Sequence, residues 1–337
     1  MLRAALQEGR AVSDAMSPQD GDRYLAAAIE ALVGSFGTRA VRDAPLGART
    51  TYRVGGRAAM LVEIDSFEDL RAMQRALVVA GGPVPVLILG QGSNLLVADG
   101  GFSGVVASLG RCFDWVEVRG ETVRAGGATK LPVVARRSVA AGLCGLEWAV
   151  GVPGSVGGAL RMNAGGHGSD TAAVLDCYRS LDLIDGVDAE HSAKRLGFGY
   201  RHSALSAGEV VLWAQFALAR GDTGRAQTAL AEVVGWRRTH QPGGSNAGSV
   251  FMNPPCDSAG RLVEEAGLRG FRMGSARVSE KHANFIQADE GGSGDDVRRL
   301  LEHVRTEVAR RTGVVLTTEV QLLGFEDSPL TLVHAGA

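Results

Sequence analysis

Clustered glycines are the feature that most constrains how this chain can fold. The sequence contains 47 glycines among 337 residues, roughly twice the average usage of about 7% in globular domains. Clustering between apolar segments indicates a backbone that turns tightly or closely approaches another group. A linker or a collagen-like chain would show low complexity or a strict period instead. The glycines gather at residues 90–92, 100–104, 151–158, 165–168 and 243–248.

The charge balance argues against a polyanionic partner. The chain has 35 basic and 37 acidic residues, for a formal net charge of −2, and both signs are spread evenly along it. We therefore expect no nucleic acid and no membrane surface as partner. No C-x-x-C pair is present, and no histidine stands near a cysteine at metal-ligand spacing, which predicts reduced thiols and no metal site. The cysteines are Cys112, Cys144, Cys177 and Cys256.

No segment has the pattern of an export signal or a membrane span. The first residues contain no continuous apolar run of signal-peptide length, and nothing later supplies about eighteen uncharged apolar residues. These features predict a cytoplasmic protein, which we expect to be a monomer.

Hydrophobic patterning predicts three units that follow an N-terminal extension. The first 24 residues have no firm pattern and are expected to be a mobile extension, whereas apolar spacing from Arg23 to Phe36 favours a helix. The predicted divisions are 1–43 for the extension, 44–105, 106–219 and 220–326 for the units, and 327–337 for a tail.

Each unit contains a recognisable local pattern. In the first, strands at 59–64 and 84–89 flank a helix that Ser66 caps and that runs to about Val79. The second has short β-branched strands and one helix at 131–141. In the third, a polar stretch at 221–225 precedes further elements. We predict helices to about 238, at 260–266 and at 295–312, extended segments at 278 and 285, and a closing strand at 314–323.

Two glycine-rich loops are candidates for phosphate binding. The first loop, Gly90-Gln91-Gly92-Ser93-Asn94, follows a buried strand, so its backbone N–H groups can converge on an anion. A tight turn between strands would use the same residues, and the loop is no G-x-G-x-x-G dinucleotide fingerprint. The second runs from Trp148 to Ala159 and continues with Met162-Asn163-Ala164-Gly165. Two such loops from different units can line both sides of an extended pyrophosphate.

The order and spacing of further motifs resemble one enzyme family. The motifs T-Y-R-V-G-G, L-G-Q-G-S-N-L-L, G-V-P-G-S-V-G-G-A and M-N-A-G are followed by Y-R-H-S, A-G-S-V-F-M-N-P, A-G-R-L-V-E, V-S-E-K-H-A-N-F-I and T-E-V. In this order they are similar to the sequence of UDP-N-acetylenolpyruvoylglucosamine reductases. The resemblance covers about residues 44–324, nearly the whole chain outside the extension.

The resemblance implies a fold and a bound cofactor. The expected class is α+β, with a two-part FAD-binding region of the vanillyl-alcohol-oxidase type and a smaller α+β substrate-binding domain. The region from 201 to 249 has no room for a substrate-capping insertion, which places the chain with the shorter type of the family. By resemblance, the FAD contacts are Tyr52, Arg53, Val54, Gly55, Gly90, Gln91, Gly92, Ser93, Asn94, Leu95, Gly151, Pro153, Gly154, Ser155, Gly157, Gly158, Asn163, Ala164 and Gly165.

The implied reaction is the reduction of an enolpyruvyl ether of a UDP-sugar, with NADPH as co-substrate. Such a reaction needs hydride delivery, stabilisation of charge that spreads into a carboxylate, and a proton. The matching positions are Arg201 and Glu319, which would orient and stabilise the carboxylate, and Ser249, which would donate the proton. Taken alone, each of these residues is more often a turn or surface residue, and only their joint occurrence in three motifs favours catalysis.

The UDP-sugar is expected to lie against the third unit. Two departures from the family pattern concern this region. Met252 stands where lysine is common, so a cationic contact to the diphosphate is either missing or supplied by Arg238 or Lys281, and Gly166-His167-Gly168 replaces A-Y-G. The candidate substrate contacts are Tyr200, Arg238, Gln241, Asn253, Lys281, His282 and Asn284.

Two other functions share parts of this pattern. An FAD-dependent sugar or alcohol oxidase of the same fold would have the flavin loops without the Y-R-H-S, G-S-V-F and T-E-V set. A nucleotide-sugar binding protein, or a paralogue without activity, would need no reactive triad. Flavin binding and oxygen consumption separate these alternatives.

Overall fold

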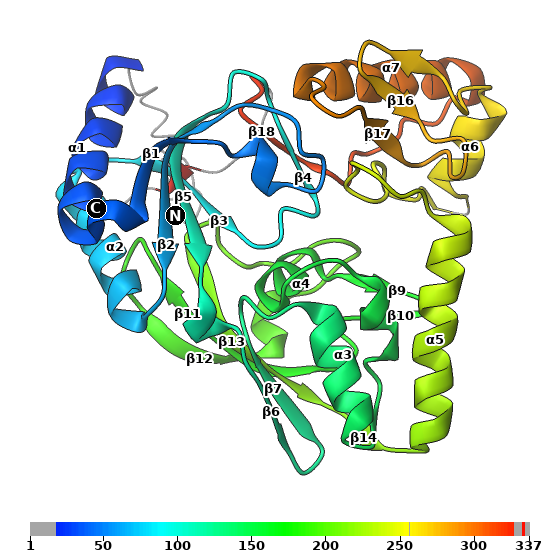
Figure 1. Ribbon diagram of the computed structural model, residues 1–337, viewed down its shortest axis with the longest axis horizontal. Coiled ribbons are helices and arrows are strands. Elements are labelled where there is room, and N and C mark those ends of the chain that lie inside the picture. Colours follow the sequence, from blue (N-terminus) through cyan, green and yellow to red (C-terminus); the bar gives the residue numbers. More distant parts are fainter. Residues whose placement is uncertain (1–17, 256, 327–331, 334–337) are drawn as a thin grey trace, which may run out of the picture.

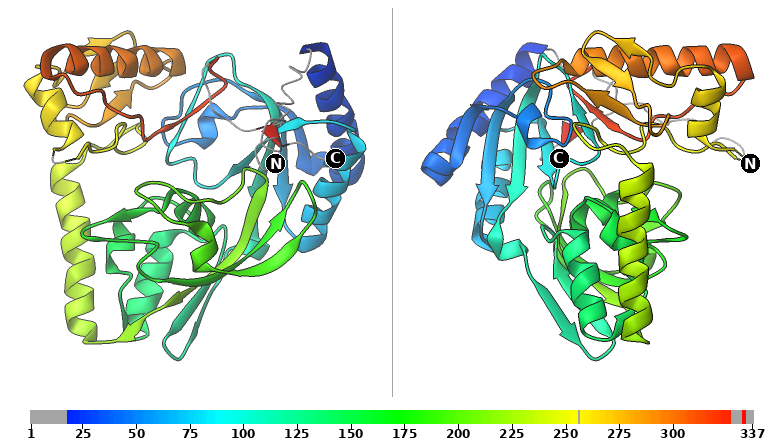
Figure 2. Two further views of the ribbon diagram at one scale, coloured as in Figure 1. Left: turned by 180° about the vertical axis from the view of Figure 1, so that it is seen from behind. Right: turned by 45° about the vertical axis from the view of Figure 1, so that its right-hand side comes forward.

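A computed structural model describes residues 18–255, 257–326 and 332–333, so residues 1–17 of the predicted extension and most of the predicted tail lie outside the described residues. Three units surround a central region, and the long helix α5 runs along one side from the second unit to the third (Figure 1). The views in Figure 2 show the same division, with the third unit against the end of α5. No helix in these ranges is long and apolar enough to span a membrane.

The first unit is a mixed sheet covered by two helices. The strand order is β1-β2-β5-β3-β19, with β2, β5 and β3 parallel. The predicted cap of α2 is confirmed, since the Ser66 side chain accepts a hydrogen bond from the backbone N–H of Asp69. Helix α1 begins at Pro18, five residues before the predicted start, and buries Leu32 and Phe36 in the sheet core. The elements are α1 (Pro18–Phe36), β1 (Ala40–Ala44), β2 (Ala58–Ile64), α2 (Phe67–Val79), β3 (Val84–Leu89), β4 (Leu95–Val97), β5 (Phe102–Leu109) and β19 (Leu332–Val333).

The second unit is an antiparallel sheet of order β12-β11-β13-β7-β6. The predicted helix at 131–141 is confirmed as α3, but α4 was not predicted, because two consecutive glycines disfavour a helix interior. Ser155 begins α4 by accepting a hydrogen bond from Gly158 N–H. The elements are β6 (Val116–Arg119), β7 (Thr122–Gly126), α3 (Leu131–Ala140), β8 (Leu143–Cys144), α4 (Val156–Met162), β9 (Gly165–Gly166), β10 (Ser169–Asp170), β11 (Leu175–Asp182), β12 (Asp188–Ser192), β13 (Glu209–Ala217) and β14 (Ala219–Arg220).

The third unit packs two helices on a small sheet of order β15-β16-β17. The predicted helices and extended segments are found within a few residues. The elements are α5 (Thr223–His240), α6 (Ala259–Glu265), β15 (Arg272–Met273), β16 (Ala276–Val278), β17 (Ile286–Ala288), α7 (Gly294–Thr312) and β18 (Gln321–Leu323). Short 3-10 turns occupy Gly37–Arg39, Gly47–Arg49, Arg111–Phe113, Glu147–Gly151 and Ala193–Leu196.

The predicted closing strand at 314–323 is wrong over most of its length. Only β18 is a strand, and it pairs in parallel with β4 of the first unit. The preceding residues alternate between exposed Val315 and buried Leu316, which imitates a strand. They form no ladder, because their neighbour at 250–252 offers only isolated backbone contacts such as Glu319 N–H to the Val250 carbonyl.

A carboxylate adds a second link between the first and third units. Asp99 follows β4, and its Oδ1 accepts a 2.7 Å hydrogen bond from the backbone N–H of Gly294 at the start of α7. The same carboxylate bonds to the hydroxyl of Ser293, while Asp99 N–H donates to Asp295. Negative charge at a helix N-terminus is favourable, so this contact holds α7 against the first unit.

Gly55 is required by the fold. It has φ +98°, and a Cβ added there would lie 2.2 Å from the carbonyl oxygen of Val97. We expect Gly55→Ala to lower the free energy of unfolding by about 1–3 kcal/mol from backbone strain alone. Gly34→Ala is the matched control, since it lies in exposed helix with nothing within 4 Å; it should raise stability by up to about 1 kcal/mol. Urea denaturation of both variants measures the difference, and equal midpoints would contradict this role.

Candidate active site

A cavity of about 590 Å³ lies where the three units meet. Its walls come from the loop after β3, the segment between the 3-10 turn at 147–151 and α4, the β9 hairpin, and the loop after α5. Sequence-distant glycine clusters therefore share one cavity, as the two-loop interpretation predicts.

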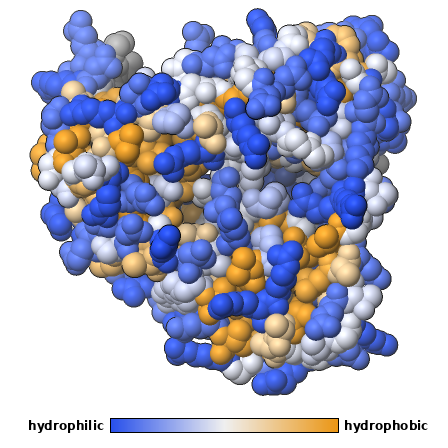
Figure 3. Space-filling model, viewed as in Figure 1, coloured by the Kyte–Doolittle hydropathy of each residue, from blue (hydrophilic) through white to orange (hydrophobic). Residues whose placement is uncertain are grey.

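Hydrophilic residues cover most of the protein face shown in Figure 3.

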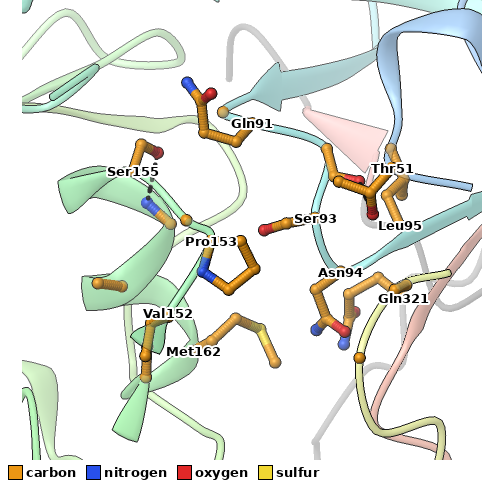
Figure 4. A pocket seen from close by; sticks show the side chains of 18 of the residues that line it. Thr51, Gln91, Ser93, Asn94, Leu95, Val152, Pro153, Ser155, Met162 and Gln321 are labelled. Atoms are coloured by element: carbon orange, nitrogen blue, oxygen red, sulfur yellow. Dashed lines mark hydrogen bonds between the residues drawn. The ribbon is translucent and has the colours of Figure 1, made fainter. Parts of the chain in front are cut away.

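The two glycine loops face each other across this cavity. Ser93 of the first loop and Pro153 of the second lie on opposite sides of the gap in Figure 4. The loops touch where Gly90 meets Ser155, because a Cβ on Gly90 would lie 2.6 Å from the Ser155 hydroxyl oxygen. Gly92 has φ +58° and its carbonyl accepts from Thr51 N–H. Glycine is thus needed in the first loop for turning and for close approach.

Backbone donors in both loops are available to a ligand. Within the described ranges, the N–H groups of residues 90–94 donate to no protein acceptor, and the same holds for Gly154 and Ser155. Gly154 is not crowded, since an added Cβ would make only ordinary van der Waals contacts at 3.8–4.0 Å. Unpaired N–H groups on side-chain-poor backbone suit phosphate oxygens. These loops therefore fit the pyrophosphate of a dinucleotide such as FAD.

The three predicted catalytic residues all lie at the cavity wall. Arg201, Ser249 and Glu319 come from different segments, yet each lines the same space. Arg201 Nε donates a 2.7 Å hydrogen bond to Glu319 Oε1, and its NH2 group donates to the Gly165 carbonyl at 3.1 Å. Asn94 Nδ2 donates to the Glu319 carbonyl at 3.1 Å. The first loop is thereby tied to the glutamate.

Burial decides the protonation tendency of Glu319. Removal from water raises its pKa above the ordinary glutamate value, and the charge and hydrogen bond of Arg201 oppose this shift without cancelling it. Arg201 holds a left-handed backbone conformation, φ +55°, at a non-glycine position. Its guanidinium is fixed by two partners, so it is oriented before a substrate arrives.

Most predicted FAD contacts lie at the cavity, but some do not. Tyr52 and Val54 are core residues of the third unit's cluster, and the Tyr52 hydroxyl has no partner among the described residues. Gly55 serves the fold. The Asn163 side chain donates hydrogen bonds to Asp170 and to the Gly199 carbonyl, and it accepts one from the Ala172 N–H. The predicted residues at the main cavity wall are Gly90, Gln91, Gly92, Ser93, Asn94, Leu95, Gly151, Pro153, Gly154, Ser155, Gly158, Ala164 and Gly165.

Arg53 and Gly157 also lie away from the main cavity wall. Gly157 instead lines a neighbouring cavity of about 110 Å³, together with Arg161 and Glu209. Sequence resemblance identifies these positions with the cofactor region as a whole and does not tell which side chains reach the ligand.

Most of the predicted substrate contacts lie outside the cavity wall. Only Gln241 of the seven lines the cavity. Asn284 is buried and brackets Phe251, accepting from its N–H and donating to its carbonyl. Asn253 accepts from Ala259 N–H at the start of α6.

The remaining candidates also stand away from the described wall. Lys281 Nζ donates to the Arg238 carbonyl at 2.6 Å. Tyr200 is 55% exposed, and burial lowers the pKa of His282. Met252 stands outside the wall too.

Several cavity residues were not predicted. Arg237 follows Val233 by four positions and precedes Gln241 by four, so all three share one face at the end of α5. This helical spacing was the signal in the sequence. His167, Asn246 and Gln321 also line the cavity. They come from loops or a short strand, where no period indicates direction.

Comparisons with known proteins agree with this geometry. A family model described as the C-terminal domain of UDP-N-acetylenolpyruvoylglucosamine reductase matches residues 240–323, and one described as an FAD binding domain matches residues 58–191. UDP-N-acetylenolpyruvoylglucosamine reductase 2 of Symbiobacterium thermophilum is 43% identical over 286 residues, covering 84% of this chain and 92% of the relative. The reductase of Synechococcus sp. is 43% identical over 297 residues, with the same coverage of each.

A solved structure gives the same result. The crystal structure of UDP-N-acetylenolpyruvylglucosamine reductase from Thermus caldophilus matches with a TM-score of 0.73 and 34% identity, covering 84% of this chain and 98% of that chain. The predicted α+β class, with an FAD-binding region and a substrate-binding domain, is confirmed. The chain belongs to the UDP-N-acetylenolpyruvoylglucosamine reductase family of FAD-dependent oxidoreductases.

Proposed function

We propose that this protein uses NADPH and FAD to reduce the enolpyruvyl group of UDP-N-acetylglucosamine enolpyruvate to UDP-N-acetylmuramate, a step in peptidoglycan precursor synthesis. One observation carries the proposal: an arginine, a serine and a glutamate from three distant segments meet at the cavity that the two glycine loops line. FAD, when bound, supplies hydride transfer between NADPH and the substrate.

We propose that Arg201 receives the substrate carboxylate. Its guanidinium is held by Glu319 and by the Gly165 carbonyl, which leaves further N–H groups for a second acceptor. Arginine presents a fixed fork that suits a carboxylate and stabilises charge that accumulates there in the transition state. Ser249 lies at the same wall, and its hydroxyl has no hydrogen-bond partner among the described residues. The hydroxyl is therefore available to give a proton to the enolpyruvyl carbon next to the terminal carbon, which takes the hydride.

Glu319 then acts as a hydrogen-bond donor. A substrate carboxylate beside Arg201 brings a second negative charge close to Glu319, and like charges raise the pKa of one partner. Burial already raises the pKa of this carboxyl group. Its protonated form can donate to the substrate carboxylate as that group becomes enolate-like, which spreads the charge over two donors.

The proposal extends to the setting of the reaction. The ligands are small molecules, a UDP-sugar and NADPH, and the protein works as a monomer in the cytoplasm. The near-neutral charge of −2 supports a partner set without polyanions.

The overall reaction is tested with an anaerobic flavin experiment. Protein loaded with FAD is reduced by NADPH until its yellow absorbance disappears, and enolpyruvyl UDP-sugar is then added. We expect the absorbance to return with formation of UDP-N-acetylmuramate. Absorbance that returns only with oxygen and a simple sugar would point to an oxidase and contradict the proposal.

Ser249→Ala tests the proton donor. We expect flavin reduction by NADPH to keep its rate, while reoxidation by the enolpyruvyl sugar slows by about 10²–10⁴-fold, the usual range for a lost acid. Ser245→Ala is the matched control, because Ser245 lies in the same loop but is not part of the cavity wall. Rapid-mixing absorbance follows both half-reactions, and an unchanged reoxidation rate in Ser249→Ala would remove the assignment.

The titration of Glu319 predicts a pH profile. Because burial raises its pKa, the protonated form persists to higher pH than in an exposed glutamate and is lost as pH rises through that value. The reoxidation rate should therefore fall with rising pH. Glu319→Gln keeps a donor that does not titrate, so it should flatten this limb of the profile. A limb that is identical in the variant would show that another group titrates.

A further inference from the structure

The side chain of Asn163 is buried next to the active site but is not part of the described cavity wall. Asn163 ends α4, is 4% exposed and has φ +40°, a left-handed conformation that asparagine adopts more readily than most residues. Its Nδ2 donates to Asp170 Oδ2 at 3.1 Å and to the Gly199 carbonyl at 3.0 Å, and its Oδ1 accepts from the Ala172 N–H at 3.0 Å. The amide therefore uses both of its N–H groups and its oxygen within the protein.

One of the donated bonds holds the backbone turn that carries Arg201. Gly199 and His202 close this turn, since the Gly199 N–H donates to the His202 carbonyl at 3.0 Å and the His202 N–H donates back at 3.3 Å. Between them, Arg201 has φ +55°, a conformation that costs free energy at a non-glycine residue and persists only where the surroundings impose it. The bond from Asn163 to the Gly199 carbonyl anchors this strained turn to the end of α4.

The other donated bond holds the hairpin that receives the Arg201 guanidinium. Asp170 pairs with Gly165 across the β9–β10 hairpin, and a Cβ added to Gly165 would lie 2.5 Å from the Asp170 Cβ, so the two residues are in close contact. The carbonyl of Gly165 accepts a hydrogen bond from the NH2 group of Arg201 at 3.1 Å. Asn163 therefore joins the turn from which the arginine side chain starts to the hairpin at which that side chain ends.

We propose that Asn163 is a positioning residue for Arg201. This inference rests on the proposed function, in which Arg201 receives the substrate carboxylate. Because one amide holds Gly199 and Asp170 at once, it sets the distance between the two anchors of the arginine and directs the guanidinium into the cavity. Both N–H groups of the amide are used in this way, so the side chain has none to donate to FAD, the role expected from the sequence. Asn163 thus acts on the substrate half-reaction and not on the cofactor.

Two substitutions at residue 163 test the proposal. Asn163→Gly and Asn163→Asp both tolerate the left-handed backbone, and both remove the two donated bonds. Asn163→Asp keeps an oxygen for the Ala172 N–H, so it retains one of the local contacts that Asn163→Gly loses. Thr171→Val is the matched control, because the buried Thr171 hydroxyl donates to the Ala164 carbonyl in the same segment, and this bond involves neither anchor of Arg201.

Isothermal titration of the oxidised, FAD-loaded protein measures recognition of the carboxylate, which UDP-N-acetylmuramate carries and UDP-N-acetylglucosamine lacks. We expect both Asn163 variants to bind UDP-N-acetylmuramate about tenfold to hundredfold more weakly, the effect of losing one charge-assisted hydrogen bond, and to bind UDP-N-acetylglucosamine unchanged. Reoxidation by the enolpyruvyl sugar should slow by about 10²-fold, the cost of misplacing a group by about 1 Å. FAD affinity and flavin reduction by NADPH should keep their wild-type values, and Thr171→Val should behave as the wild type throughout.

A double-mutant cycle separates positioning from a general loss of stability. Arg201→Asn tolerates the left-handed conformation of residue 201 and removes the guanidinium. If Asn163 acts through Arg201, adding Asn163→Gly to Arg201→Asn should leave the affinity for UDP-N-acetylmuramate unchanged.

The proposal is overturned if Asn163→Gly weakens UDP-N-acetylmuramate equally in both backgrounds, or if both Asn163 variants bind it as the wild type does. Loss of FAD from both Asn163 variants but not from Thr171→Val would also overturn it, since the side chain would then serve the cofactor. Failure of the overall reaction looks different, because the wild-type flavin would stay reduced when the enolpyruvyl sugar is added.

Discussion

The parallel pairing of β18 with β4 is the constraint on which the site depends. This contact returns the end of the third unit to the first unit and sets Glu319 two residues before the paired strand. Two hydrogen bonds hold the backbone of Glu319. Its N–H donates to the Val250 carbonyl, and its carbonyl accepts from the Asn94 side chain. The pairing of β18 with β4 and these two hydrogen bonds thus fix the positions of Glu319, the loop that carries Ser249 and the first glycine loop relative to one another. Arg201 is then the one reactive side chain that a different unit supplies.

The electrostatics of the cavity follow from this arrangement. Arginines outnumber acidic groups on the described wall, and burial raises the pKa of the one carboxyl group there, Glu319. Such a cavity attracts anionic nucleotides and disfavours the approach of cationic ligands. Because the Arg201 guanidinium is held by Glu319 and by the Gly165 carbonyl, little reorganisation of this donor is needed when charge develops on a substrate.

Local sequence signals predicted local structure well. The βαβ segment of the first unit was predicted because Ser66 caps a helix between two apolar runs, and both features act over a few residues. The two glycine loops and the three reactive residues were predicted from motif resemblance. The failures involve long-range packing. Residues 314–320 alternate like a strand but have no sheet neighbour, and α4 forms across Gly157 and Gly158 because its cap and surroundings outweigh their poor propensity.

Side-chain direction was the least predictable property of the site. Asn284 and Asn253 stand in family motifs, yet they support backbone turns and do not face the cavity. An amide serves either purpose equally well, and the sequence alone does not distinguish them. Arg238 was predicted as a site residue and Arg237 was not, although Arg237 lines the cavity. Adjacent helical residues point about 100° apart, and the sequence did not show which of the two faces the cavity.

The length of helix α5 sets the spacing between the second and third units and the direction in which residues at its far end point. Its 18 residues span roughly 27 Å, and Arg237 and Gln241 belong to the cavity only because of their angular position at its far end. Each residue inserted or deleted within the helix would turn that end by about 100° and direct a different face inward. The helix must therefore keep its residue count for these two residues to face the cavity.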